Sequence, residues 1–122
     1  MLFRSELLHD WLEAEGYQVL TADNLHAGFA AVRSQPPNAI LLDIQLGGDD
    51  GLSLVSWLRR QPALQHIPVI AVTAHAMLSE QKRILEAGCN DILSKPINFR
   101  LLRECLERRL AAYGNEVFRE RL

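Results

Sequence analysis

The sequence has few cysteines, no long apolar run and no leader pattern, and each absence narrows the class of protein. The two cysteines, Cys89 and Cys105, lack the CxxC spacing of zinc sites and redox pairs, so we expect both to be small buried hydrophobic residues. No apolar stretch is long enough to span a bilayer, and no signal peptide precedes the first predicted helix. We therefore expect a cytoplasmic protein that does not interact with a membrane.

An excess of charge of one sign is also missing. The formal net charge of -2 argues against a nucleic-acid-binding domain. The charge is unevenly distributed: residues 1–50 carry eight acidic and two basic side chains, and residues 51–122 carry seven acidic and eleven basic ones. The C-terminal arginines alternate with glutamates, as on a solvated helix. There are no internal repeats and no low-complexity linker. With 122 residues, 48% of them hydrophobic, the chain has the size and composition of one globular domain.

Helical and strand patterns alternate along the chain. Apolar residues at three- and four-residue spacing predict a first helix that Gly16 ends. Later helices are expected after Asp23 or Asn24, from Leu52, from Ser79 as N-cap to Ala87, and after Asn98. Short apolar runs between these helices predict strands over 17–22, 39–43, 68–73 and 92–95. Strands that alternate with helices through short connections predict an α/β fold, a doubly wound parallel sheet within a three-layer α/β/α architecture.

Three of the predicted strands end in polar residues of complementary chemistry. Asp43 follows Ala39-Ile40-Leu41-Leu42, Thr73 follows Val69-Ile70-Ala71-Val72, and Lys95 follows Ile92-Leu93-Ser94. Taken singly, each has an ordinary structural explanation: a loop-capping aspartate, a threonine with strand propensity and a solvated lysine. The carboxyl ends of parallel strands meet at one edge of the sheet, so we expect a carboxylate, a hydroxyl and an ammonium to converge there. Such a set is suited to handling a phosphoryl group.

The motifs around these residues resemble the receiver domain of two-component response regulators. They occur in the order Leu41-Leu42-Asp43-Ile44-Gln45-Leu46, Asp50-Gly51-Leu52, Pro68-Val69-Ile70-Ala71-Val72-Thr73-Ala74, Ala87-Gly88 and Ser94-Lys95-Pro96-Ile97. The resemblance extends from about residue 1 to residue 113 and implies a flavodoxin-like sheet of five strands. It leads us to expect a receiver domain over 1–113 and a C-terminal tail over 114–122.

The resemblance also implies roles for individual residues. Asp43 would accept a phosphoryl group from a sensor histidine kinase or a phosphotransfer protein, Thr73 would hydrogen-bond a phosphoryl oxygen, and Lys95 would pair with it. Magnesium would be held by Asp43 and by the backbone carbonyl of Gln45. The domain would phosphorylate itself from the donor without being an enzyme in the ordinary sense.

Further implied roles concern switching and output. Ala74, Ile92 and Pro96 occupy switch or loop positions of the family, and the Lys95-Pro96 bond corresponds to one that is cis in it. Ile92 stands where the family often has an aromatic residue or histidine. We expect output by contact with a downstream protein, through the face of 79–87 and 98–110. A homodimer through the last two helices is an expectation from the resemblance alone.

The sequence departs from the family at its start. Family members open with a buried strand followed by an acidic pair that binds magnesium, whereas here the chain begins at the first helix, so the fold would be truncated at its N-terminus and the metal site incomplete. The missing strand belongs in the middle of the sheet. The tail Glu116-Val117-Phe118-Arg119-Glu120-Arg121-Leu122 carries four charges in seven residues, which is not typical of a central parallel strand, so we do not expect it to fill this place.

Two other functions stay open. A pseudo-receiver that binds partners without phosphorylation is favoured if the acidic pair is absent from the protein in the cell. A flavodoxin-like flavin or nucleotide enzyme would need a phosphate-cradling loop after the first strand, and it would leave Asp43 and Lys95 unexplained.

Overall fold

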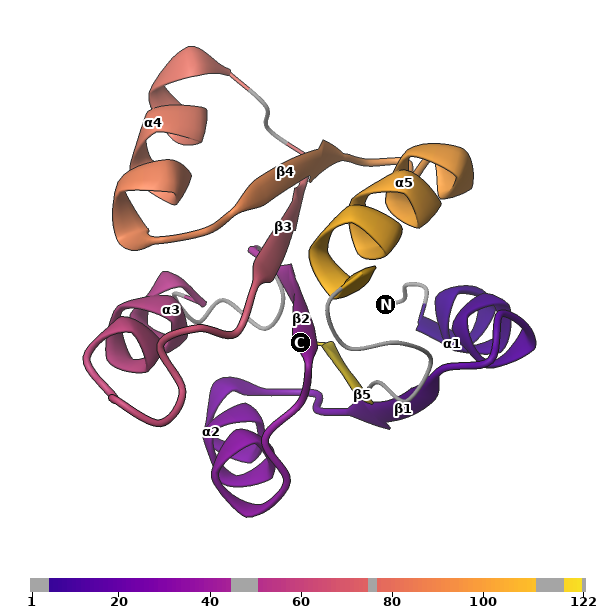
Figure 1. Cartoon of the computed structure of the whole chain (residues 1–122). Coiled ribbons are helices and arrows are strands. Elements are labelled where there is room, and N and C mark those ends of the chain that lie inside the picture. Colours follow the sequence, from indigo (N-terminus) through magenta and orange to yellow (C-terminus); the bar gives the residue numbers. More distant parts are fainter. Residues whose placement is uncertain (1–4, 45–50, 75–76, 112–117, 122) are drawn as a thin grey trace.

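The computed structural model describes residues 5–44, 51–74, 77–111 and 118–121, and within them helices and strands alternate (Figure 1). The elements are α1 (Ser5–Ala14), β1 (Gln18–Thr21), α2 (Leu25–Ser34), β2 (Ala39–Asp43), α3 (Leu52–Arg59), β3 (Val69–Thr73), α4 (Leu78–Ala87), β4 (Asp91–Ser94), α5 (Phe99–Leu110) and β5 (Phe118–Arg121).

The strands form one parallel five-stranded sheet in the order β1-β5-β2-β3-β4. Helices α1 and α5 cover one face and α2, α3 and α4 cover the other (Figure 1). Each face has its own apolar core: Ile40 and Leu42 of β2 pack on the α2–α4 side, while Ala39 and Leu41 pack on the α1 and α5 side. The predicted three-layer, doubly wound parallel fold is confirmed.

The helix ends mostly follow the predicted capping residues. The side chain of Asn24 accepts a hydrogen bond from the amide of Ala27 at 2.8 Å, and that of Asn98 accepts from two amides at the start of α5. The prediction that Ser79 caps α4 is wrong: the N-cap is Met77, two residues earlier, and its side chain makes no capping hydrogen bond. This end of α4 therefore lacks the capping contact that α2 and α5 have.

The expectation that the C-terminal tail lies outside the sheet is also wrong. Residues 118–121 form β5, which lies between β1 and β2 (Figure 1) and pairs Arg119 with Val19 on one side and with Ala39 on the other. Without β5, the backbone donors and acceptors on the facing edges of β1 and β2 would have no ladder partner. The side-chain composition of a strand is a weak preference, whereas backbone pairing in the sheet interior is close to obligatory, and it decides the position of this segment.

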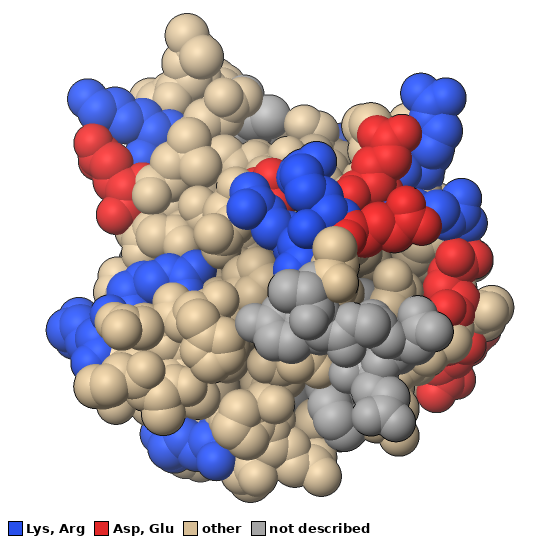
Figure 2. Space-filling view, viewed as in Figure 1, with Lys and Arg blue, Asp and Glu red and all other residues tan. Residues whose placement is uncertain are grey.

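The expectation that both cysteines are buried is confirmed. Cys89 and Cys105 are buried and unbridged. Trp57 packs edge-to-face on Phe29 with ring centroids 5.1 Å apart, and Trp11 packs on Phe99 at the same distance. In the viewed face of Figure 2, basic side chains are interspersed with acidic ones toward the right, on the α1 and α5 side. No helix within the described ranges has the length and apolar character needed to cross a membrane.

Candidate functional site

Asp43 is a carboxylate at the end of a fully buried strand. All five residues of β2 are buried, and Asp43 itself retains 5% of its exposed surface. The amide of Ile44, the next residue, donates to the carbonyl of Val72 at 3.0 Å, so the ladder with β3 continues past Asp43 and holds its backbone in place. A buried carboxylate normally needs polar partners, and its position at the carboxyl end of the strand is where such partners gather.

Lys95, which directly follows β4, is one of these partners. Its Nζ lies 2.7 Å from Oδ2 of Asp43, and the two side chains are 28% and 4% exposed. The backbone amide of Lys95 donates to the carbonyl of Thr73 at 2.9 Å, and the Lys95-Pro96 peptide bond is cis, as expected. The lysine is thus positioned by the main chain of β3 as well as by its ion pair with Asp43.

Thr73 lies on the strand between these two residues. It is the last residue of β3, fully buried, and it pairs in register with Ser94, while Val72 pairs with Asp43. The structure therefore brings the ends of β2, β3 and β4 to one edge of the sheet, as the sequence predicted. Asp43, Thr73 and Lys95 all lie at this edge, together with Ser94.

The remaining predicted positions surround this edge. Ala74 follows Thr73 and is exposed, and Pro96 is exposed beside the cis bond. Ile92 is half-buried and packs against the core on the α2–α4 side, where an apolar side chain fits without a polar partner. Gln45, whose carbonyl was expected to bind magnesium, lies outside the described residues.

Within the described residues, the side chains around Asp43 do not by themselves build a magnesium site. Magnesium takes oxygen ligands in near-octahedral geometry, usually one or two protein carboxylates with waters or substrate phosphates. One oxygen of Asp43 is already paired with Lys95, and within the described ranges no group of three metal-capable side chains includes Asp43. A protein-built cage for magnesium is therefore not formed by these residues.

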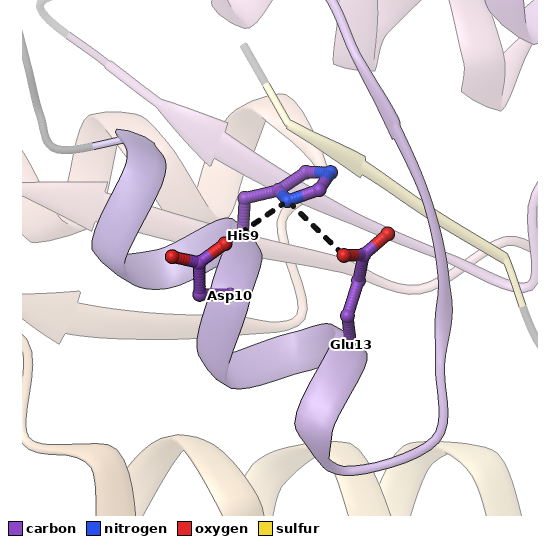
Figure 3. Close-up of side chains that lie close together, drawn as sticks. All are labelled: His9, Asp10 and Glu13. Atoms are coloured by element: carbon purple, nitrogen blue, oxygen red, sulfur yellow. Dashed lines mark ion pairs between the residues drawn. The ribbon is translucent and has the colours of Figure 1, made fainter.

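The group of three metal-capable side chains that does occur in the described residues lies on α1. Figure 3 shows His9 beside Asp10 and Glu13, with its Nδ1 at 3.8 Å and 3.6 Å from their carboxylate oxygens. Both distances exceed a hydrogen bond, and the spacing is that of neighbours on one turn of a helix. His9 is half-buried and the two carboxylates are exposed, so the three side chains form a surface arrangement on one helix.

One positioned residue has no signal in the sequence. Arg59 looks like an ordinary basic residue in the last turn of a helix, yet its guanidinium donates hydrogen bonds to three backbone carbonyls and to the side chain of Asn90. These partners lie 6 to 31 residues away along the chain, so no local pattern identifies them.

Comparisons with known proteins agree with this geometry. Residues 3–107 match the family described as the response regulator receiver domain. The polar-differentiation response regulator DivK of Brucella anthropi is 42% identical over 93 residues, which cover 76% of each chain. DivK of Brucella ovis is 41% identical over the same length and shares of the chains.

Solved structures show the same fold. The receiver domain of a signal transduction histidine kinase from Syntrophus aciditrophicus has a TM-score of 0.83 at 30% identity, covering 93% of this chain and 86% of that one. The receiver domain of a sensor histidine kinase from Pseudomonas aeruginosa PAO1, with a magnesium ion coordinated in its active-site cleft, has a TM-score of 0.75 at 33% identity, covering 88% of each chain. This chain belongs to the family of response regulator receiver domains.

Proposed function

We propose that this receiver domain is a phosphoacceptor of a two-component phosphorelay, with Asp43 as the residue that is phosphorylated. The observation that supports this most strongly is the buried Asp43 carboxylate held 2.7 Å from the Lys95 ammonium at the carboxyl edge of the sheet, next to Thr73. A carboxylate beside an ammonium and a hydroxyl is the set of groups needed to accept and neutralise a phosphoryl group.

The chemistry follows from these groups. A carboxylate oxygen of Asp43 attacks the phosphorus of a donor, a phosphohistidine or a small acyl phosphate, and the bond from phosphorus to the donor breaks with its electron pair on the leaving group. The product is an acyl phosphate on Asp43. The reaction brings an anion to an anion, so a nearby cation must offset the charge. Lys95 supplies that charge, and the Thr73 hydroxyl is a donor for a phosphoryl oxygen.

Magnesium remains an expectation from the family, with Asp43 and the Gln45 carbonyl as its ligands. Because the described residues do not build a magnesium cage, we expect this chain to bind the ion weakly. Lys95 then carries a larger share of charge compensation than it would beside a complete metal site.

The partners follow from the same proposal. A sensor histidine kinase or a phosphotransfer protein delivers the phosphoryl group, and a cytoplasmic downstream protein reads it. Exposed apolar side chains on α4 and α5 support contact with such a partner: Leu78 is 83% exposed, Leu85 51% and Leu101 43%. Their apolar surface is available for burial against a protein.

The test is the intact mass of the full chain after incubation with a small acyl-phosphate donor, with and without magnesium. We expect a gain of one phosphoryl group that is absent from Asp43→Asn and preserved in Asp10→Asn, which changes an exposed carboxylate of α1. A phosphoryl gain that persists in Asp43→Asn would contradict the proposal. Absence of any gain would favour the alternative, a pseudo-receiver that binds partners without phosphorylation.

The alternative has one supporting observation, the lack of a magnesium cage around Asp43 in the described residues. In a pseudo-receiver, the Asp43–Lys95 pair would be a permanent structural contact. Partner binding would then be unchanged by Asp43→Asn and by treatment with the phosphoryl donor.

A further inference from the structure

Arg59 donates hydrogen bonds to several segments at the end of the sheet opposite Asp43, where the parallel strands begin. From the end of α3, its Nε and Nη2 donate to the carbonyl of Gly88 at 3.0 and 2.8 Å, and Nη1 donates to the carbonyls of Gln65 and Ile67, each at 2.8 Å. Nη2 also donates to Oδ1 of Asn90 at 2.9 Å. The planar guanidinium, with its donors in a fixed fork, can satisfy several acceptors at once.

The groups that accept hydrogen bonds from Arg59 carry no charge, but helix dipoles favour a positive charge at this position. Gly88 is the C-cap of α4, and Arg59 itself is in the last turn of α3, so the negative ends of two helix dipoles meet at one guanidinium. Arg59 is half-buried; burial lowers the pKa of its guanidinium, and the nearby Cys89 acts in the opposite direction.

The C-terminal end of α4 is also closely packed. Gly88 has a φ of +116°, and a Cβ placed there would come within 2.9 Å of Cγ of Arg59 and 3.3 Å of a methyl group of Val55. Oδ1 of Asn90 accepts a second hydrogen bond, from the amide of Val69 at 2.8 Å, and the amide of Asn90 donates to the carbonyl of Val69. The contacts of Arg59 therefore extend to the start of β3.

The N-terminal end of α4 has the opposite character. Its N-cap, Met77, makes no side-chain capping bond and is 67% exposed, and Leu78 is 83% exposed. Ile84, in the second half of the helix, is the one buried residue of α4, whereas α5 has four buried residues and a capping Asn98. Helix α4 is thus held mainly at one end.

We infer that Arg59 anchors the C-terminal end of α4, so that displacements of this helix occur at its N-terminal end, close along the chain to Thr73. The anchor and the site lie at opposite ends of β3, about 13 Å apart for four residue steps. Helix α4 then pivots about its C-terminal end, and its N-terminal end lies on the side of the sheet where phosphorylation would act. The anchor is a property of the unmodified protein, while its use in signalling rests on the proposed function.

The test is native-state amide hydrogen exchange, followed by NMR on the unphosphorylated full chain. The amides of Gln81 and Gly88 are both hydrogen-bonded within the helix, at 2.8 and 3.0 Å, so they report the two ends on equal terms. We expect the amides of Gly88 and Cys89 to be protected at least about tenfold more than that of Gln81. In Arg59→Gln, we expect their protection to fall by about 10- to 100-fold, while that of Leu41 and Leu42 in β2 is unchanged.

Two further variants make the result specific. Arg60→Gln changes the neighbouring exposed arginine and should leave the exchange pattern as in the parent chain. Arg59→Lys keeps the positive charge but loses the planar set of guanidinium donors. It should give a smaller loss of protection, confined to the C-terminal end of α4. Equal protection at both ends of α4 in the parent chain would overturn the inference. It would equally be overturned if both Arg59 variants lowered protection in β2 as much as in α4, which would make Arg59 a general stabiliser. Failure to phosphorylate Asp43 would leave this test unaffected.

Discussion

Deletion of the last five residues, Phe118 to Leu122, should destabilise the whole domain and not only its C-terminus. These residues include β5, which lies between β1 and β2 in the middle of the sheet. Removal of a terminal segment is usually tolerated when its backbone is exposed and unpaired. Here the strand pairs on both sides, so its loss opens the sheet from within.

The size of the effect can be worked out from β2. The amide of Ile40 donates to the carbonyl of Pro68 on the β3 side, so its neighbours Ala39 and Leu41 direct their backbone groups toward β5. Both residues are at most 1% exposed. Leaving about four buried backbone groups unpaired, at about 1–3 kcal/mol each, costs about 4–12 kcal/mol. That is comparable with the whole stability of a domain of this size, about 5–15 kcal/mol.

The assay is urea unfolding followed by far-ultraviolet circular dichroism. We expect the parent chain to unfold cooperatively and the deleted chain to show a shallow transition or none. The matched control is Arg119→Val with Arg121→Val, which keeps the strand and gives it the apolar composition typical of central parallel strands, so its midpoint should equal or exceed that of the parent. A deleted chain with the parent's midpoint and slope would refute the placement of β5 in the sheet.

Three further predictions concern individual side chains. Ile84→Ala should cost about 2–5 kcal/mol of unfolding free energy in urea, because Ile84 is fully buried, whereas Leu85→Ala, at a half-exposed position, should cost less than about 0.5 kcal/mol; equal costs would contradict the packing of α4. Lys95→Met leaves the buried Asp43 without its ammonium, so urea unfolding should show a loss of about 1–3 kcal/mol and intact mass a slower phosphoryl gain, and an unchanged rate would exclude Lys95 as the compensating charge. Burial raises the pKa of the Cys89 thiol from 9.0 to about 12, although the nearby Arg59 acts to lower this pKa. Between these pH values the thiol loses its proton in the unfolded chain but not in the folded one, so the free energy of unfolding should fall with rising pH by up to about 1.4 kcal/mol per pH unit. Cys89→Ala should remove this part of the pH dependence.

The site was predictable from the sequence because its signals are local. Asp43 and Thr73 directly follow apolar runs, and Lys95 follows Ile92-Leu93-Ser94. A parallel sheet brings the carboxyl ends of its strands to one edge whatever the details of packing. The helix start at Asn98, and that at Asp23 or Asn24, were predictable for the same reason, since a cap is satisfied by amides two or three residues away; the structure uses Asn24. The predicted cap of α4 is two residues too late because Ser79 is a good capping residue that the chain does not use as one.

The sequence by itself determined the alternation of helices and strands, the parallel sheet and the three polar residues at its edge, because these depend on periodicity and on residues next to one another in the chain. Only the tertiary structure decided that β5 enters the middle of the sheet and that Arg59 holds the end of α4. Both depend on backbone groups far away in sequence that need a partner once they are buried. A charged strand and a helix-terminal arginine meet that need, although neither has a local pattern that predicts it.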